Sequence, residues 1–246
     1  MFVKAEIPLD VPICQYMRLD YFISLLATGE YFVRPRCEFE DAFEANLPLP
    51  KMFPAHEAGK TVPSEVREDE MKKMSEKLEA NRENGKLLTS CWCLQTCENL
   101  LMWNCYASKI GVRIKSTVRR FVSALNTDAY DILCGRMNYT VYNYYNDDFL
   151  FSKDKGYGGE DEFRFYFIPK ATDQDSDSEK PKSVRIKVNL SALIEDVLLS
   201  PYIETRAANK ICKLAKDKYG ITMRPSSLKI NPVSYTHLRA HETSQD

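Results

Sequence analysis

The chain has 246 residues, enough for one large domain or two small ones with a sizeable buried core. Its 34 basic and 35 acidic residues nearly cancel, which excludes a general long-range attraction to nucleic acid or anionic membranes but leaves room for a local basic cleft. No apolar stretch reaches transmembrane length and the N-terminus has no signal-peptide core, so the eight cysteines indicate reduced thiols in a cytoplasmic protein.

The N-terminal part of the chain predicts two strands around a helix. Residues 2–7 are strand-like, and apolar residues between positions 21 and 26 recur at helical spacing until Gly29, a residue type that ends helices in the left-handed conformation. Residues 30–34 are aromatic and β-branched and predict a second strand. Residues 64–82 predict a long charged helix whose thin apolar stripe is typical of a surface helix or lid.

Residues 87–117 predict the buried centre of the fold, since they contain both tryptophans and four of the eight cysteines. The apolar and aromatic run at 87–93 is typical of a buried strand. Residues 98–107 predict a helix that is apolar nearly all round and therefore buried, with Trp103 in the core. At 112–115, alternation of apolar and basic residues predicts a half-exposed strand.

The second half of the chain predicts alternating strands and helices of ordinary length. The return strand follows a short polar linker at 171–182, which indicates a hairpin. The elements are, in order, a helix over 116–125, strands over 132–144, 162–167 and 184–188, and helices over 190–197 and 204–219. The sequence therefore predicts an α+β fold: a mixed, largely antiparallel split sheet with surrounding helices.

The last residues differ in character from the rest. Residues 232–243 match the reading-frame translation of a common sequencing-library transposon adapter. We therefore expect a single domain over residues 1–231, and a non-native tail over residues 232–246. Two of the three histidines, His237 and His241, lie in this tail and are left out of any candidate site.

Metal and histidine chemistry have little support in the remaining sequence. Cys91, Cys93, Cys97 and Cys105 follow the spacing C-x-C-x3-C-x7-C, whereas zinc ribbons and fingers favour paired C-x2-C units. We interpret these cysteines as packing residues and predict no metal. His56 is the one histidine outside the tail, and no phosphate-binding loop is present.

Carboxylates carry the stronger signal, in the two clusters FEDAFE at 39–44 and GGEDEFR at 158–164. Glycines place the second cluster where a loop meets a strand whose phenylalanines face the core. Alternation puts Glu160, Glu162 and Arg164 on the opposite face, and Glu162 can pair with Arg164. The alternative is a surface ladder of opposite charges, worth at most about 1 kcal/mol.

The order FEDAFE, SCWC…ENLLMWNCYASKIGVRIKST, GEDEFRFYF and LIEDVLLSP resembles the bacterial family called domain of unknown function 2971, over roughly Cys14 to Ile230. The family often has Asn-Asp-Pro where this chain has residues 40–42, and often has histidine at the position of Cys105. Any role of that asparagine or histidine in the family therefore does not transfer to this chain. Similar proteins occur among abortive-infection systems of phage defence. Their layout is similar to the ADP-ribosyltransferase fold.

This resemblance implies an NAD-dependent ADP-ribosyltransferase or NAD glycohydrolase, with NAD as the cofactor. Glu162 would stabilise the positive charge that develops on the ribose as the nicotinamide bond breaks, and Glu160 would position an acceptor. Arg18 would bind a phosphate or ribose, and an aromatic residue such as Tyr31 would stack on nicotinamide. The resemblance implies Glu162 and Glu160 as catalytic residues and Tyr16, Arg18, Tyr31, Asp41, Tyr106 and Arg164 as substrate-binding residues.

Two other function classes stay open. One is a non-catalytic interaction module, in which the strand of Glu162 and Arg164 is only a charged face. The other is a metal-dependent nuclease that uses both acidic clusters. An enzyme acting on NAD requires Arg18 and Glu162 in one concave pocket, whereas a nuclease requires Asp41 or Glu44 within metal-sharing reach of the second cluster. The partners expected are a nucleotide and an unidentified protein or nucleic-acid acceptor, without a membrane.

Overall fold

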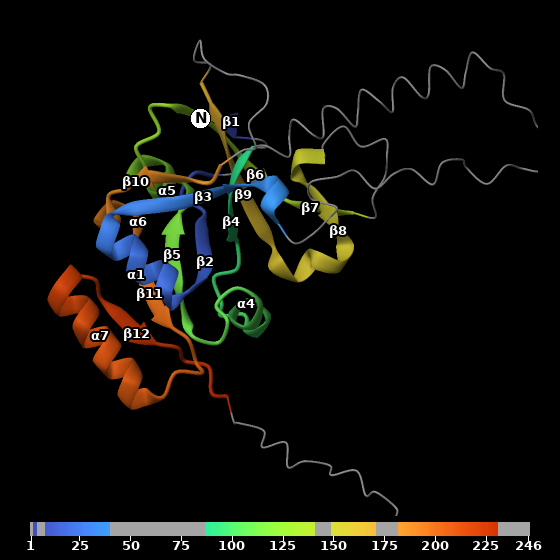
Figure 1. The fold of residues 1–246 in the computed structure, drawn as a ribbon. Helices are drawn as coiled ribbons and strands as arrows, with labels where there is room; N and C mark the ends of the chain where they lie inside the picture. The colour runs from blue at the N-terminus through green and yellow to red at the C-terminus, as the bar shows by residue number, and fades with distance from the viewer. Residues whose placement is uncertain (1, 4–7, 40–86, 141–148, 171–181, 231–246) are drawn as a thin grey trace, which may run out of the picture.

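The computed structural model describes residues 2–3, 8–39, 87–140, 149–170 and 182–230, which form an α+β fold, as predicted (Figure 1). The strands are β1 (Phe2–Val3), β2 (Pro12–Arg18), β3 (Glu30–Pro35), β4 (Leu88–Cys93), β5 (Gly111–Thr117), β6 (Tyr130–Arg136), β7 (Asn138–Thr140), β8 (Ser152–Asp154), β9 (Glu162–Pro169), β10 (Val184–Lys187), β11 (Asp196–Leu199) and β12 (Met223–Pro225). The α-helices are α1 (Leu19–Thr28), α4 (Leu100–Cys105), α5 (Val118–Ala124), α6 (Leu190–Leu193) and α7 (Thr205–Tyr219). Short 3₁₀ helices are η1 (Arg36–Glu38), η2 (Phe149–Phe151) and η3 (Lys155–Glu160).

The large sheet divides into two halves at β4. Its main path is β1-β6-β9-β4-β2-β5-β11-β12, and β3 with β10 branches from β4. Because β9 pairs with the whole of β4, β2 and β3 must share the other edge: β3 pairs at Leu88 and Thr89, and β2 pairs at Cys93 through Cys14. Within this sheet, β1–β6 and β11–β12 are parallel and the other pairs are antiparallel. This is the predicted mixed, largely antiparallel arrangement.

The main hydrophobic core lies on one face of β9. Phe163, Phe165 and Phe167 are fully buried there, as their alternation predicted. Phe121 of α5 packs on this face, with its ring centroid 4.4 Å from that of Phe165. Phenylalanine side chains bury large apolar areas, so this cluster fixes the position of β9 and of the residues that point to its other face.

The central segment is buried more completely in its strands than in its helix. On β5, the predicted half-exposed strand, Arg113 is only 5% exposed and donates to the Thr96 carbonyl, so that prediction is wrong. In α4, Trp103 is fully buried as predicted, but Leu100 and Leu101 are about half exposed. The prediction of an all-round buried helix is therefore wrong, because α4 covers the sheet with one side and meets solvent with the other.

Two predictions for the C-terminal part of the chain differ from the observed structure: the length of one helix and the partner of one strand. The helix predicted over 190–197 ends at Leu193, and Asp196–Leu199 is strand β11, which pairs with β5 and β12. The return strand β10 pairs with β3 rather than with β9, so the predicted hairpin is wrong. In both cases a short apolar run is compatible with several partners, and long-range pairing decides the outcome.

The predicted strand over 132–144 divides at Met137. Its first part is β6, which pairs with β9 along its length, and its second part is β7, which pairs with β8 in a separate small sheet. Together β7, β8 and η3 lie at one side of the molecule, away from α7 (Figure 1). Within the described ranges, no helix is long and apolar enough to cross a membrane. The predicted helix over 64–82, residues 171–181 of the linker and the tail lie outside these ranges.

Candidate functional site

The second face of β9 carries charged residues that are buried. Glu162 is 3% exposed and Arg164 is fully buried, because the segment of β7, β8 and the short helices η2 and η3 lies over this face. Tyr166, next on the same face, packs against Phe151 in a small cluster. The alternative of a surface charge ladder is therefore wrong.

Two salt-bridged pairs form one network on this face. Arg164 holds Glu162 with two parallel hydrogen bonds, from Nε to Oε1 at 2.5 Å and from Nη2 to Oε2 at 2.8 Å. Lys153, on β8, bridges the carboxylates of Glu160 and Glu162, with Nζ–Oε2 distances of 2.6 and 3.3 Å. Two cations and two carboxylates thus share a site with little access to water, where charge interactions are strong.

Glu160 reaches this network from the turn before β9 and not from the strand itself. Asp154 caps η3 by accepting from the Gly156 N–H at 2.7 Å, and the chain turns back at Asp161, whose φ of 43° is left-handed. Arg136 of the neighbouring strand holds the Asp161 carboxylate at 2.8 Å. The prediction that Glu160 lies on the strand face is corrected, because it is the last residue of η3, although its carboxylate meets that of Glu162 through Lys153.

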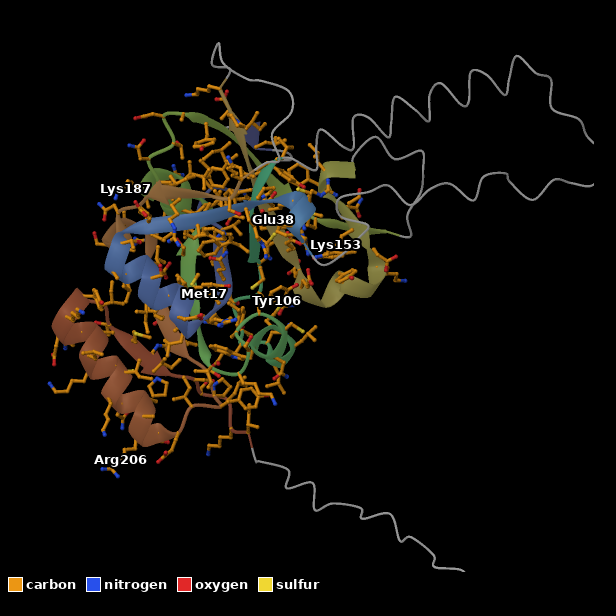
Figure 2. All side chains as sticks on the ribbon, viewed as in Figure 1. Met17, Glu38, Tyr106, Lys153, Lys187 and Arg206 are labelled. Atoms are coloured by element: carbon orange, nitrogen blue, oxygen red, sulfur yellow. The ribbon has the colours of Figure 1, made fainter. Side chains whose placement is uncertain are left out.

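Tyr106, immediately after α4, links the network to the surface. Its hydroxyl donates to Glu160 Oε1 at 2.5 Å, while the residue as a whole is 42% exposed. Burial of the hydroxyl and the negative charge of Glu160 raise the pKa of Tyr106, so it remains a donor at neutral pH. Figure 2 shows Tyr106 and Lys153 on the same side of the molecule. Among the predicted binding residues that the structure describes, Tyr106 is the one that is both exposed and in contact with a predicted catalytic carboxylate.

Tyr16 is connected to the same turn but is itself buried. Its ring packs edge-on against Trp103, with the centroids 4.9 Å apart, and its hydroxyl accepts from the Asn99 N–H at 2.9 Å. The Asn99 side chain in turn donates to the Gly159 carbonyl at 3.2 Å. Tyr16 is 6% exposed and therefore supports η3 through Asn99 from within the fold, which corrects its predicted role in substrate binding.

Arg18 lies apart from the network. It ends β2 with half of its side chain exposed and pairs with Asp20, with an Nη2–Oδ2 distance of 2.7 Å. Within the described ranges it makes no hydrogen bond with Glu160 or Glu162. The predicted convergence of Arg18 and Glu162 is thus not supported by these contacts. The remaining candidate Asp41, with most of its acidic cluster, lies outside the described residues.

The side chain of Tyr31 lies in the main hydrophobic core and not beside the charged network of Glu160 and Glu162. It is 3% exposed in the main core, where its ring lies 5.2 Å from that of Phe121. Its hydroxyl bonds to Ser90 at 2.7 Å and to Gln15 at 2.8 Å, which satisfies it internally. These contacts are those of a packing residue, which corrects the expectation that Tyr31 stacks on nicotinamide.

Lys153 and Tyr157 belong to the site but carry no sequence signal that we recognised. Lys153 is 6% exposed, and its ammonium lies 4.6 Å from the centre of the partly exposed Tyr157 ring, a cation–π contact. A lysine in the polar run SKDKGYGG is normally interpreted as a surface residue. Its burial follows from the folding of β8 against β9, a contact that local patterns do not encode.

The charge state of Glu162 is held by its neighbours. Burial alone would raise the pKa of this carboxyl, but the charge and hydrogen bonds of Arg164, followed by the charge of Lys153, reverse the effect and lower it to about 2 from an ordinary 4.5. Glu162 is therefore a fixed anion at every pH at which an enzyme normally works.

This shift predicts a pH dependence of stability. Because the pKa of Glu162 is lowered on folding, its stabilisation is complete above about pH 4.5 and is lost as the pH falls towards 2. The difference in unfolding free energy between wild type and Glu162→Gln should therefore be constant near neutrality and shrink over that acid range. Urea unfolding at a series of pH values measures it, and a difference that grows in acid would contradict the assignment.

The cysteines of the central segment do not share one environment. Cys93 is buried opposite Cys14, whereas Cys97 and Cys105 are exposed, so the packing interpretation holds for only part of the set. Burial raises the pKa of Cys93 to about 12, which keeps its thiol protonated. No group of three or more metal-binding side chains is found in the part of the chain that the structure describes.

Comparison of the chain with protein-family models, curated proteins and solved structures finds no match in any of the three. The resemblance to domain of unknown function 2971, and the more distant one to ADP-ribosyltransferases, therefore stays a prediction from the sequence.

Proposed function

We propose that the chain is an enzyme that cleaves the nicotinamide bond of NAD, as an ADP-ribosyltransferase or NAD glycohydrolase, and that Glu160 is its ligand-facing carboxylate. One observation supports this most: the two Glu160 oxygens accept hydrogen bonds from Tyr106 and from Lys153, and Lys153 in turn contacts the ring of Tyr157, which is partly exposed like that of Tyr106. A role in phage defence is the setting that the family resemblance suggests.

The residues fit the chemistry of this bond. When it breaks, its electron pair leaves with nicotinamide, positive charge develops at the ribose carbon, and water or an acceptor adds there with loss of a proton. A carboxylate held in a water-poor site stabilises such charge. The exposed rings of Tyr106 and Tyr157 offer stacking surfaces for a planar base beside Glu160.

This proposal exchanges the roles that the resemblance implied for the two glutamates. Glu162 is clamped by Arg164 and almost without exposure, so it is suited to holding Lys153 in place. Lys153 then fixes Glu160. Buried ion pairs contribute little net stability compared with apolar packing, whereas a carboxylate fixed by a second layer of contacts is what catalysis requires. Arg18 pairs with Asp20 apart from this network, so the expected convergence of Arg18 and Glu162 is not part of this proposal and Arg18 is given no role at the site.

Glu160→Gln should reduce NAD turnover by about 100- to 1000-fold, because it removes the charge and keeps the shape. The measurement is NAD consumption and nicotinamide release by chromatography, with circular dichroism to check the fold. Glu204→Gln, which alters an exposed glutamate at the start of α7, is the matched control and should leave turnover unchanged. Equal turnover by wild type and Glu160→Gln, or the absence of both NAD binding and turnover in wild type, would overturn the proposal.

A second candidate, the interaction module, is favoured by a different observation. Leu100, Leu101, Tyr106 and Ile110 are all 42–60% exposed around α4, and such apolar groups often mark a protein contact. In this alternative the charged network would have no catalytic role and would only hold Tyr106 in position on the contact surface. The NAD experiment separates the two, since a binding module has no turnover for Glu160→Gln to reduce.

A further inference from the structure

Helix α7 has a charge unlike that of the whole chain. It carries five basic side chains and one acidic one in 15 residues, while the chain has a net charge of −1. The basic residues are Arg206, Lys210, Lys213, Lys216 and Lys218, and all of them are exposed. The charge is thus concentrated at one end of the molecule, where Figure 2 places Arg206. Such local asymmetry creates a positive potential even in a nearly neutral protein.

Most of this charge is not paired with acidic side chains in the described ranges. Arg206, Lys210 and Lys216 make no ion pair with any residue that the structure describes. Lys213 pairs with Asp217 at 2.7 Å, but both side chains are more than half exposed, so solvent screens this contact and leaves it weak. A polyanion can displace such a contact easily.

Three of the basic side chains form a row along the helix. Arg206, Lys210 and Lys213 are spaced by four and three residues, so they share one face and span roughly 10 Å along the axis. The opposite face anchors the helix, with Ala208 and Ala215 buried in the main core. The row is therefore presented to solvent by a rigid element.

We propose that α7 binds the phosphate backbone of a nucleic-acid duplex through Arg206, Lys210 and Lys213. A duplex carries about one negative charge per 1.7 Å of axis, so a row of this length faces several phosphates. Arginine and lysine donate charge-assisted hydrogen bonds to phosphate oxygens without reading sequence. An anionic membrane fits less well, because Leu214 is the one large apolar side chain exposed on the helix, and membrane-surface helices need a broad apolar face.

The test compares two triple variants of the full chain with equal changes in net charge. One replaces Arg206, Lys210 and Lys213 by Gln; the control replaces the exposed Lys170, Lys182 and Lys187 by Gln. Figure 2 shows Lys187 well separated from Arg206. Fluorescence anisotropy with short labelled DNA and RNA duplexes gives the affinity between about 50 and 200 mM salt. Vesicles containing phosphatidylserine serve as the membrane probe.

The α7 variant should bind the duplex at least about tenfold more weakly at the lowest salt, and its salt slope should be shallower by about 2 to 3 units, since each lost phosphate contact removes about 0.9. The control should match wild type. Equal loss in both variants, no duplex binding by wild type, or binding to the vesicles alone would overturn the proposal. None of these readouts involves NAD, so this proposal and that for Glu160 succeed or fail separately.

Discussion

Arg164→Met is expected to lower the free energy of unfolding by about 3–5 kcal/mol, although methionine fills a similar space. The loss comes from Glu162, which stays buried at 3% exposure after its strongest partner has been removed. Lys153 remains 3.3 Å from one oxygen and offsets only part of this cost. Urea unfolding followed by circular dichroism measures the change.

The chain offers a matched control for this prediction. Arg224 holds Asp196 with the same two-bond geometry, at 3.0 and 2.8 Å, but its side chain is 64% exposed. Arg224→Met should therefore cost less than about 1 kcal/mol. The double variant Glu162→Gln with Arg164→Met should recover most of the stability lost by Arg164→Met alone. If Arg164→Met lowers the free energy of unfolding by no more than Arg224→Met does, the buried charges of the network interact only weakly. The assignment of Glu162 as a fixed anion would then be wrong.

The sequence predicted the strands of the core more successfully than the site. Strict alternation of Phe163, Phe165 and Phe167 correctly gave β9 and its buried face, because this pattern is local. The same alternation correctly placed Glu162 and Arg164 together on the other face. It could not show that this face is covered, because the cover comes from β7 and β8, whose position depends on pairing between distant segments.

The errors have more than one cause. Lys153 was missed because its partner carboxylates lie seven and nine residues away, across a turn that no local pattern announces. The strand β11 was predicted as part of a helix because four residues are too few to show a period. Tyr31 was assigned by motif position alone, and the alternation of β3 turns it into the core. Side chains whose role depends on long-range contacts are those that sequence patterns predict least well.

Trp103→Ala is expected to destabilise the protein by about 3–5 kcal/mol, since the largest apolar side chain would be removed from a position with no exposure. The cavity would open between α4 and the strands, where Trp103 packs on Tyr16 and donates to Glu98 at 3.2 Å. Leu101→Ala, two residues earlier in α4 but half exposed, should cost less than about 1 kcal/mol. Because Tyr16 also supports η3 through Asn99, loss of Trp103 should loosen the turn that carries Glu160, and NAD turnover should fall even where the fold survives. A Trp103→Ala protein with wild-type stability would show that α4 is not anchored by this ring.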